Sequence, residues 1–247
     1  MKQIISILGQ LIGLGFFLFF LLFIGNPSNA KKTQQEIEGE KVLASLENDS
    51  ITKVNEEIDA VQKKIENTTQ EKEKSLVKRY EKALIMGDSI IEGIADYEIL
   101  KNTSVIGIRG RRVNNIEEDL KTAVTLSPQI IFLSYGLNDL EYFVQNVNQY
   151  IAGYEKDIHY LQEHVKDVKI YVLGILPIKE ETMEKIPAYK NRNIYNQALQ
   201  KMCKQDFCTY IDASQMVKEK DYEPDGIHFA PSFYKPWLTY IADKAHL

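Results

Sequence analysis

The chain has 247 residues, of which 44% are hydrophobic and 10% are aromatic. This composition excludes a disordered protein, and the length suits one domain with a full core or two small ones. Against 35 acidic residues stand 30 basic ones, and the net charge of -5 is not that of a nucleic-acid binder.

The first thirty residues are expected to form a transmembrane anchor or a signal segment. Residues 4–25 carry no charge, and a helix of that length would cross a hydrocarbon core of about 30 Å. The alternative is a cleaved secretory signal, because residues 28–30 are small, although signal cores usually have only about 7–15 apolar residues. Either interpretation places the rest of the chain outside the cytoplasm, membrane-anchored or secreted.

Residues 31–80 are dense in Lys and Glu and contain no Pro, and no aromatic residue before Tyr80. Such a stretch cannot build a core, so we expect a charged helical stalk. Its apolar residues recur at spacings of three and four, as in a coiled coil that would make a homodimer: Ile51, Val54, Ile58, Val61 and Ile65. Asn67, Thr68 and Thr69 interrupt this pattern, and a solvated spacer of partial helicity is the alternative.

Residues 81–247 alternate short apolar runs with amphipathic segments of helical length. The expected strands are 82–87, 103–108, 129–136, 169–177 and 209–214. The expected helices lie around 115–125, 146–165, 190–204 and 232–245. Strands that are apolar on both faces indicate a parallel sheet covered on both sides, and therefore a three-layer α/β/α domain. In such a domain, ligands bind beyond the carboxyl ends of the strands.

Polar groups follow several of these strands at that edge. Ser89 comes after the first strand, Gly110 after the second, Asn138 after the third, and Asp225 with His228 before the last helix. A neutral imidazole can take the proton of a serine hydroxyl, and a carboxylate on its other nitrogen fixes the tautomer. Two backbone amides and an Asn side chain could donate hydrogen bonds to an oxyanion. These residues therefore include a nucleophile, a base with its orienting carboxylate, and oxyanion donors, which are the groups that acyl transfer requires.

Each residue of the set also has an ordinary structural interpretation. Ser89 could be a helix N-cap, Asn138 a loop or cap residue, and Asp225 with Gly226 a turn. Of the four histidines, however, His228 alone falls in a loop at the expected edge. Because the elements follow the correct strands in order, the sequence favours the catalytic interpretation.

Residues 82–246 resemble the SGNH hydrolases, also called GDSL-type esterases. The "GDS" at 87–89 is similar to the first block of that family, "GIRG" at 107–110 to the second, "GLND" at 136–139 to the third, and "DGIH" at 225–228 to the fifth. With the apolar N-terminal segment, the chain resembles the membrane-anchored bacterial type. The resemblance implies a flavodoxin-like sheet of five parallel strands and no metal or organic cofactor.

The resemblance also implies roles for individual residues. Ser89 would be the nucleophile, with Asp225 and His228 completing the triad. The oxyanion hole would be formed by Ser89, Gly110 and Asn138. The second block departs from the pattern, because Arg109 lies where small residues are common, and this leaves the shape of the oxyanion side open.

Three of the five arginines of the chain, Arg109, Arg111 and Arg112, fall within four residues beside this block. Arginine suits bidentate recognition of carboxylates and phosphates, so these side chains are candidates for binding an anionic group on the substrate. The alternative is ion pairing with acidic residues of the following helix, such as Glu117, Glu118 and Asp119.

Cys203 and Cys208 could form a short disulfide in an oxidising compartment. The alternative is two unpaired small apolar side chains. No second Cys or His pair at metal spacing lies nearby, so no metal site is expected.

A tethered esterase outside the cell would meet esters on surface polymers, so we expect O-acetyl or other short acyl esters of cell-surface glycans as substrates. The alternative is an O-acetyltransferase, because an acyl-serine can pass its acyl group to a sugar hydroxyl where water is excluded. Related anchored domains work beside a membrane acyltransferase, which would then be a partner. A third hypothesis, a non-catalytic tethered binding domain, does not require an oriented base.

Overall fold

The computed structural model describes residues 34–205 and 208–247. The chain divides into two compact units, Met1–Lys64 and Ile65–Leu247. The predicted membrane segment, residues 4–25, lies outside the described residues. Within the described part, no helix combines the length and the apolarity that crossing a membrane requires.

Helix α2 (Gln34–Arg79) occupies most of the stretch predicted as a stalk. It continues through Asn67–Thr69, where the sequence pattern is interrupted, because Asn and Thr lower helix propensity only slightly. Seven large apolar side chains of α2 are exposed, and they include every residue of the predicted seam: Val42, Leu43, Ile51, Val54, Ile58, Val61 and Ile65.

The last turn of α2 and Tyr80, which follows it, belong to the second unit and pack against its core. Leu76 and Tyr80 are buried, and the Tyr80 hydroxyl donates a hydrogen bond of 2.8 Å to the backbone oxygen of Leu238. Arg79 pairs with Asp243 at 2.6 Å. These contacts fix where the α/β domain begins.

A five-stranded parallel sheet forms the centre of the second unit. Its strands are β1 (Ala83–Gly87), β2 (Val105–Gly107), β3 (Ile130–Ser134), β4 (Lys169–Leu173) and β5 (Thr209–Ile211). Their order is β2-β1-β3-β4-β5, the flavodoxin-like arrangement. All five predicted strands are present, each one shorter than its predicted range.

The strand order reverses between β1 and β3, and open α/β sheets bind ligands beside such a reversal. Gly87 at the end of β1 aligns with Gly107 in β2 and with Ser134 in β3. The loops that follow these three strands therefore start at the same level of the sheet edge.

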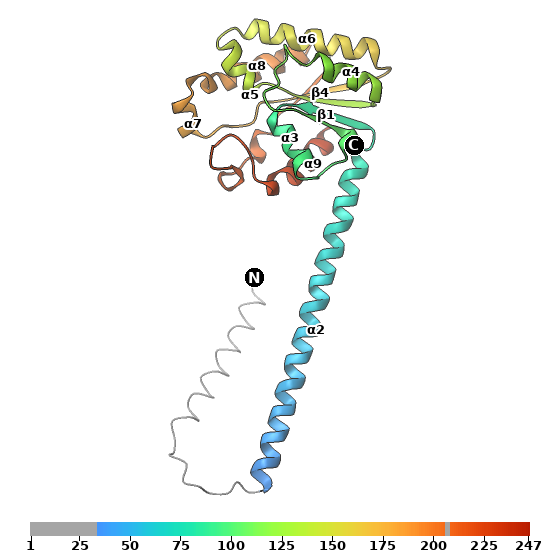
Figure 1. Cartoon of the computed structure of the whole chain (residues 1–247), viewed down its shortest axis with the longest axis vertical. Coiled ribbons are helices and arrows are strands. Elements are labelled where there is room, and N and C mark those ends of the chain that lie inside the picture. The colour runs from blue at the N-terminus through green and yellow to red at the C-terminus, as the bar shows by residue number, and fades with distance from the viewer. Residues whose placement is uncertain (1–33, 206–207) are drawn as a thin grey trace. The chain divides into compact units, whose positions relative to one another are not determined.

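Helices cover both faces of the sheet, so the predicted three-layer α/β/α architecture is confirmed (Figure 1). One face carries α4 (Glu117–Leu126), α6 (Val147–His164) and α8 (Arg192–Cys203), and the other carries α3 (Ser89–Asp96) and α9 (Pro231–Lys244). The sequence predicts α4, α6, α8 and α9 to within two residues at each end.

Three helices were not among those predicted: α3, α5 (Leu137–Phe143) and α7 (Glu180–Lys185). Each has eight residues or fewer, which is too short for an apolar period of 3.6 residues to be recognised. Short 3-10 helices complete the fold at Asn102–Ser104, Pro187–Asn191, Ser214–Met216 and Glu219–Asp221.

The two cysteines, for which the sequence leaves a disulfide and two unpaired side chains open, are bonded to each other in the structure. Cys203 is the last residue of α8, and it forms a disulfide with Cys208 just before β5, with their Cα atoms 4.9 Å apart. The bond closes the short connection from the last helix of one face to the edge strand.

Candidate active site

Ser89 is the first residue of α3 and directly follows the turn after β1. Asp88 is the N-cap of this helix, because its Oδ1 accepts a hydrogen bond of 3.1 Å from the backbone N–H of Ile90. Capping is thus done by the residue before Ser89, which leaves the serine hydroxyl to other partners. Gly87 is required here, because a Cβ at this position would lie 2.5 Å from the backbone oxygen of Ser134.

Three predicted residues from distant parts of the sequence meet in one chain of hydrogen bonds. The Nε2 atom of His228 lies 2.9 Å from Oγ of Ser89, and its Nδ1 atom lies 2.5 Å from Oδ2 of Asp225. The imidazole therefore stands between a hydroxyl and a carboxylate, the arrangement that lets a base take the serine proton.

The turn that carries Asp225 and His228 is fixed from within. Oδ1 of Asp225 accepts hydrogen bonds from the backbone N–H groups of Ile227 and His228, at 2.9 and 3.0 Å. Burial by itself would raise the pKa of Asp225, but the hydrogen bonds from the His228 ring and from these amides outweigh it and lower the pKa. The carboxylate is thus ionised at neutral pH and can stabilise an imidazolium.

The same turn is also held from outside, by α7 and the residue before it. The Thr182 hydroxyl donates a hydrogen bond of 2.8 Å to the backbone oxygen of Asp225, and the N–H of Lys179 donates one of 2.9 Å to that of Gly226. Gly226 has a φ of 72°, which favours glycine, and a Cβ there would lie 2.5 Å from the Thr182 hydroxyl. The sequence contains no signal that links Thr182 to the catalytic turn.

On the oxyanion side, Asn138 lines the same cleft as Ser89 and His228. Its Nδ2 atom donates a hydrogen bond of 3.1 Å to the backbone oxygen of Arg111, in the loop that contains Gly110. A side-chain amide has two N–H groups, so Asn138 can hold this loop and still donate to an oxyanion. Gly110 is not among the residues that line the cleft, but its φ of 77° is the left-handed conformation that favours glycine.

Asp139, which the sequence did not distinguish from an ordinary loop residue, also holds the loop that contains Gly110. It is fully buried, and its Oδ1 accepts a hydrogen bond of 3.1 Å from the N–H of Val113. Burial raises its pKa to about 7, an effect that the nearby Asp88 carboxyl increases. Asp139 therefore connects the start of α5 to the loop after β2.

Of the three arginines predicted to bind the substrate, Arg111 and Arg112 do not line the cleft. Arg111 makes a bidentate ion pair with the buried Asp119, at 2.8 and 2.9 Å, which is the alternative that the sequence left open. The guanidinium of Arg112 lies over the ring of Tyr142, 4.4 Å from its centroid. Neither side chain lines the cleft, because each is drawn to a partner on a neighbouring helix.

Arg109 is the arginine of the three that lines the cleft. Its side chain is 77% exposed, and its Nε atom lies 3.3 Å from Oε2 of Glu92. The cleft is open and has a volume of about 450 Å³. Acidic and tyrosine side chains make up much of its remaining wall: Glu92, Asp96, Glu223, Tyr97, Tyr189 and Tyr234.

No metal centre accompanies this site within residues 34–205 and 208–247, where no three His, Cys, Asp or Glu side chains are grouped so as to hold an ion. A hydroxyl, an imidazole, a carboxylate and an amide donor suffice for nucleophilic acyl transfer.

Comparison with known proteins matches residues 85–235 to the GDSL-like lipase/acylhydrolase family. Among solved structures, one from Streptococcus pneumonia, provisionally named a platelet activating factor, shares 22% identity and a TM-score of 0.55, over 75% of this chain and 97% of its own. A GDSL-like lipase from Bacteroides thetaiotaomicron shares 19% sequence identity and a TM-score of 0.54, and the match covers 68% of this chain and 91% of the lipase. A carbohydrate esterase of family 3 from Talaromyces cellulolyticus shares 16% sequence identity and a TM-score of 0.51, and the match covers 66% of this chain and 95% of the esterase.

At these identities the solved structures support the fold, and the search of curated proteins gives no match. The family match, in contrast, covers more than half of the chain and includes Ser89, Asn138 and His228. The resemblance stated from the sequence motifs is confirmed at the level of the family. The chain belongs to the GDSL-like lipase/acylhydrolase family and is an enzyme of the esterase type.

Proposed function

We propose that the protein removes O-acetyl or other short acyl groups from cell-surface glycans through an acyl-enzyme on Ser89. Oγ of Ser89 attacks the carbonyl carbon of the ester while His228 takes its proton. Asp225 holds the imidazole and stabilises its charged form, and Asn138 donates a hydrogen bond to the oxyanion. The leaving alkoxide takes the proton from His228, and water then hydrolyses the acyl-serine by the same steps.

The observation that carries this proposal is the pair of hydrogen bonds that joins Ser89 to His228 and His228 to Asp225. The pair lies at the carboxyl ends of the strands, beside the reversal of strand order, where α/β sheets bind ligands. A domain that only binds a partner does not need a base oriented in this way. The geometry therefore favours a catalytic role for each of the three residues.

A glycan substrate fits the character of the cleft. The open cleft presents carboxylates that can accept hydrogen bonds from sugar hydroxyls, and tyrosines whose rings can pack against sugar rings. The carbohydrate esterase from Talaromyces cellulolyticus has the same fold. We assign Arg109 as the residue that would contact an anionic group on the substrate, since its guanidinium is exposed in the cleft.

We further propose that residues 4–25 anchor the enzyme in a membrane with the catalytic domain outside the cytoplasm. The support is the uncharged apolar run and the disulfide, a bond typical of oxidising compartments. The exposed apolar seam of α2 supports a homodimer through the stalk. Protease digestion of intact cells, followed by detection of the domain, tests the location.

The function is tested with the full chain in detergent, as wild type, Ser89→Ala and the matched control Ser232→Ala. Ser232 is an exposed serine of α9, outside the cleft. Each protein is incubated with p-nitrophenyl acetate and an acceptor sugar, and both nitrophenolate release and sugar acetylation are followed. We expect the control to match the wild type and Ser89→Ala to lose about 10⁴–10⁶ in kcat.

The two products separate the candidate reactions. Release that depends on Ser89, with an unmodified sugar, supports the esterase. Acetylated sugar would instead identify an O-acetyltransferase, which requires a membrane acyltransferase as donor. Equal release by the wild type and Ser89→Ala would contradict both.

A further inference from the structure

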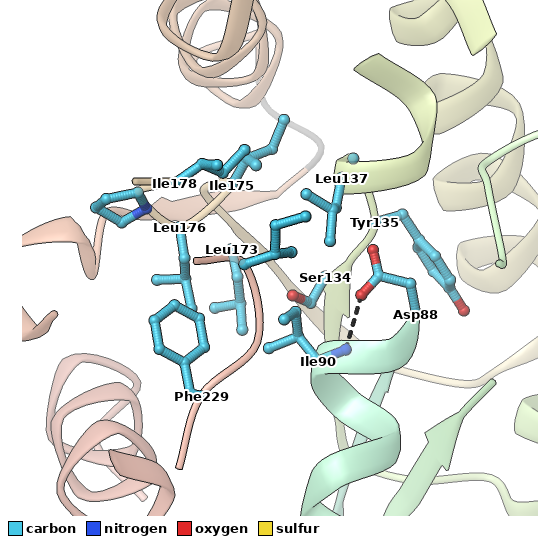
Figure 2. A pocket seen from close by; sticks show the side chains of 13 residues that line it. Asp88, Ile90, Ser134, Tyr135, Leu137, Leu173, Ile175, Leu176, Ile178 and Phe229 are labelled. Atoms are coloured by element: carbon cyan, nitrogen blue, oxygen red, sulfur yellow. Dashed lines mark hydrogen bonds between the residues drawn. The ribbon is translucent and has the colours of Figure 1, made fainter. Parts of the chain in front are cut away.

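A small apolar pocket lies next to the cleft, between the N-terminus of α3, the loop after β3 and the segment after β4 (Figure 2). Asp88 and Ile90, which flank Ser89 in the sequence, both line it. Three of its lining residues also line the cleft: Leu137, Ile227 and Phe229. Ser89 itself lines the cleft and not the pocket, so the pocket shares walls with the cleft that holds the hydroxyl that would carry an acyl group.

The pocket wall is made mainly of aliphatic side chains from the last residue of β4 and the segment after it. Leu173, Ile175, Leu176 and Ile178 are all buried, and Figure 2 shows them facing Ile90 and Leu137. The carboxyl of Asp88 is one of the few polar groups there, and its Oδ1 is already engaged by the N–H of Ile90. Such a wall favours an apolar group over water or a sugar hydroxyl.

The pocket is also very small. Its volume is about 20 Å³, little more than the space of one water-sized sphere. A methyl group has about that size, whereas a propyl chain does not fit unless a wall residue moves. The pocket is far smaller than the cleft of about 450 Å³, which has the room for a sugar.

We propose that this pocket receives the methyl group of an acetyl ester and limits the acyl group to two carbons. The inference rests on the proposed esterase function and adds to it the identity of the acyl group. The alcohol part of the substrate then occupies the cleft. In the reaction, the acetyl carbonyl carbon forms a bond to Oγ of Ser89 and loses its bond to the sugar oxygen, which leaves with the proton from His228.

Ile178 is the residue best placed to test the limit, because it is 6% exposed, lines the pocket and lies outside the cleft. Ile178→Ala enlarges the pocket by three carbon atoms. Ile170→Ala, in β4, removes the same atoms from a residue of similar burial that does not line the pocket, and serves as the matched control. Ile178→Val, which removes one carbon, replaces the alanine variant if that variant does not fold.

The full-length wild type, these variants and Ser89→Ala are assayed with the p-nitrophenyl esters of acetate, propionate, butyrate and hexanoate. We expect the wild type to prefer acetate over butyrate by at least about 10-fold in kcat/KM, because an unwanted methylene costs about 10–200-fold in a fitted pocket. Ile178→Ala should raise the ratio of butyrate to acetate by about 10-fold, and Ile178→Val should raise it less. Ile170→Ala should leave the ratio unchanged.

Wild-type activity on butyrate and hexanoate that equals the activity on acetate, and that disappears in Ser89→Ala, would overturn the acetyl pocket and leave the esterase function standing. An equal change of ratio in Ile178→Ala and Ile170→Ala would also overturn it. Hydrolysis of all four esters that does not depend on Ser89 would instead remove the proposed function, and the pocket assignment with it.

Discussion

The two sides of the site are held in place by different means. On the base side, Asp225 and His228 lie three residues apart in a turn whose hydrogen bonds are mostly its own. On the oxyanion side, Asn138 and the loop of Gly110 come from different strands and are joined by one hydrogen bond from the Asn138 amide to the backbone of Arg111. Geometry set by neighbouring residues can be predicted from spacing, whereas geometry set between loops requires the fold.

The carboxyl groups of Asp225 and Asp139, one on each side of the site, differ in exposure and in the direction of their pKa shifts. Asp225 is half-exposed and receives three hydrogen bonds, which lower its pKa against the effect of burial. Asp139 is fully buried, and its burial raises its pKa to about 7. One carboxylate is thus stabilised in its charged form beside an imidazole, and the other is a structural group whose burial disfavours its charged form.

The largest effect should come from the base side. Asp225→Asn keeps the size of the side chain but favours the wrong imidazole tautomer, and we expect kcat on p-nitrophenyl acetate to fall by about 10⁴. Asp212→Asn is the control, because Asp212 accepts a backbone hydrogen bond after β5 and lies outside the cleft. A fall of less than about 10-fold in Asp225→Asn would show that this carboxylate does not orient the base.

A smaller loss is expected on the oxyanion side. Asn138→Ala should lower kcat by about 10²–10³, because one oxyanion donor is lost. Asn191→Ala is the matched control: its amide also donates to a backbone oxygen, that of Val144, away from the cleft. An unchanged kcat in Asn138→Ala would assign this amide to loop structure alone.

Substitutions of Arg111 and Arg109 should have different effects, the first on the stability of the fold and the second on substrate binding. Arg111→Ala leaves the buried Asp119 without its bidentate partner, so we expect a loss of about 1.5–3 kcal/mol in unfolding free energy. Arg109→Ala should leave the Tm unchanged and raise KM for an anionic ester more than for a neutral one. Denaturant unfolding and a pair of substrates measure the two effects, and a Tm loss in Arg109→Ala with none in Arg111→Ala would reverse the assignment.

Most of the domain could be predicted from the sequence, because buried parallel strands are apolar on both faces and amphipathic helices have a clear period. The triad residues could be predicted for a related reason, since the carboxyl ends of parallel strands share one edge. For Arg111 the sequence left ion pairing with Asp119 open as an alternative but could not choose it, and the contact of Arg112 with Tyr142 could not be predicted, because helix packing decides both. Thr182 went unnoticed because α7 has no periodic pattern and meets the turn of Asp225 only in the folded chain.

The smallest effect should appear as a pH dependence of stability that Asp139 contributes. The pKa of its carboxyl rises on folding from 3.8 to about 7, so between about pH 4 and pH 7 the folded state holds a proton that the unfolded state has lost. The contribution of Asp139 to stability therefore declines as pH rises through that window.

Asp139→Asn removes this decline, and Asn can still accept the hydrogen bond from Val113. The Tm of variant and wild type is measured by thermal unfolding at about pH 5 and about pH 8. Relative to the wild type, the variant should gain Tm at the higher pH, by about 2–4 °C for each kcal/mol of unfolding free energy that the Asp139 carboxyl costs the wild type there. Because burial also raises the pKa of Asp88 and Asp157 to about 7, the slope should become shallower without vanishing. A Tm difference that is the same at both pH values would show that Asp139 does not change its protonation on folding, and the contrast with Asp225 would then be one of position alone.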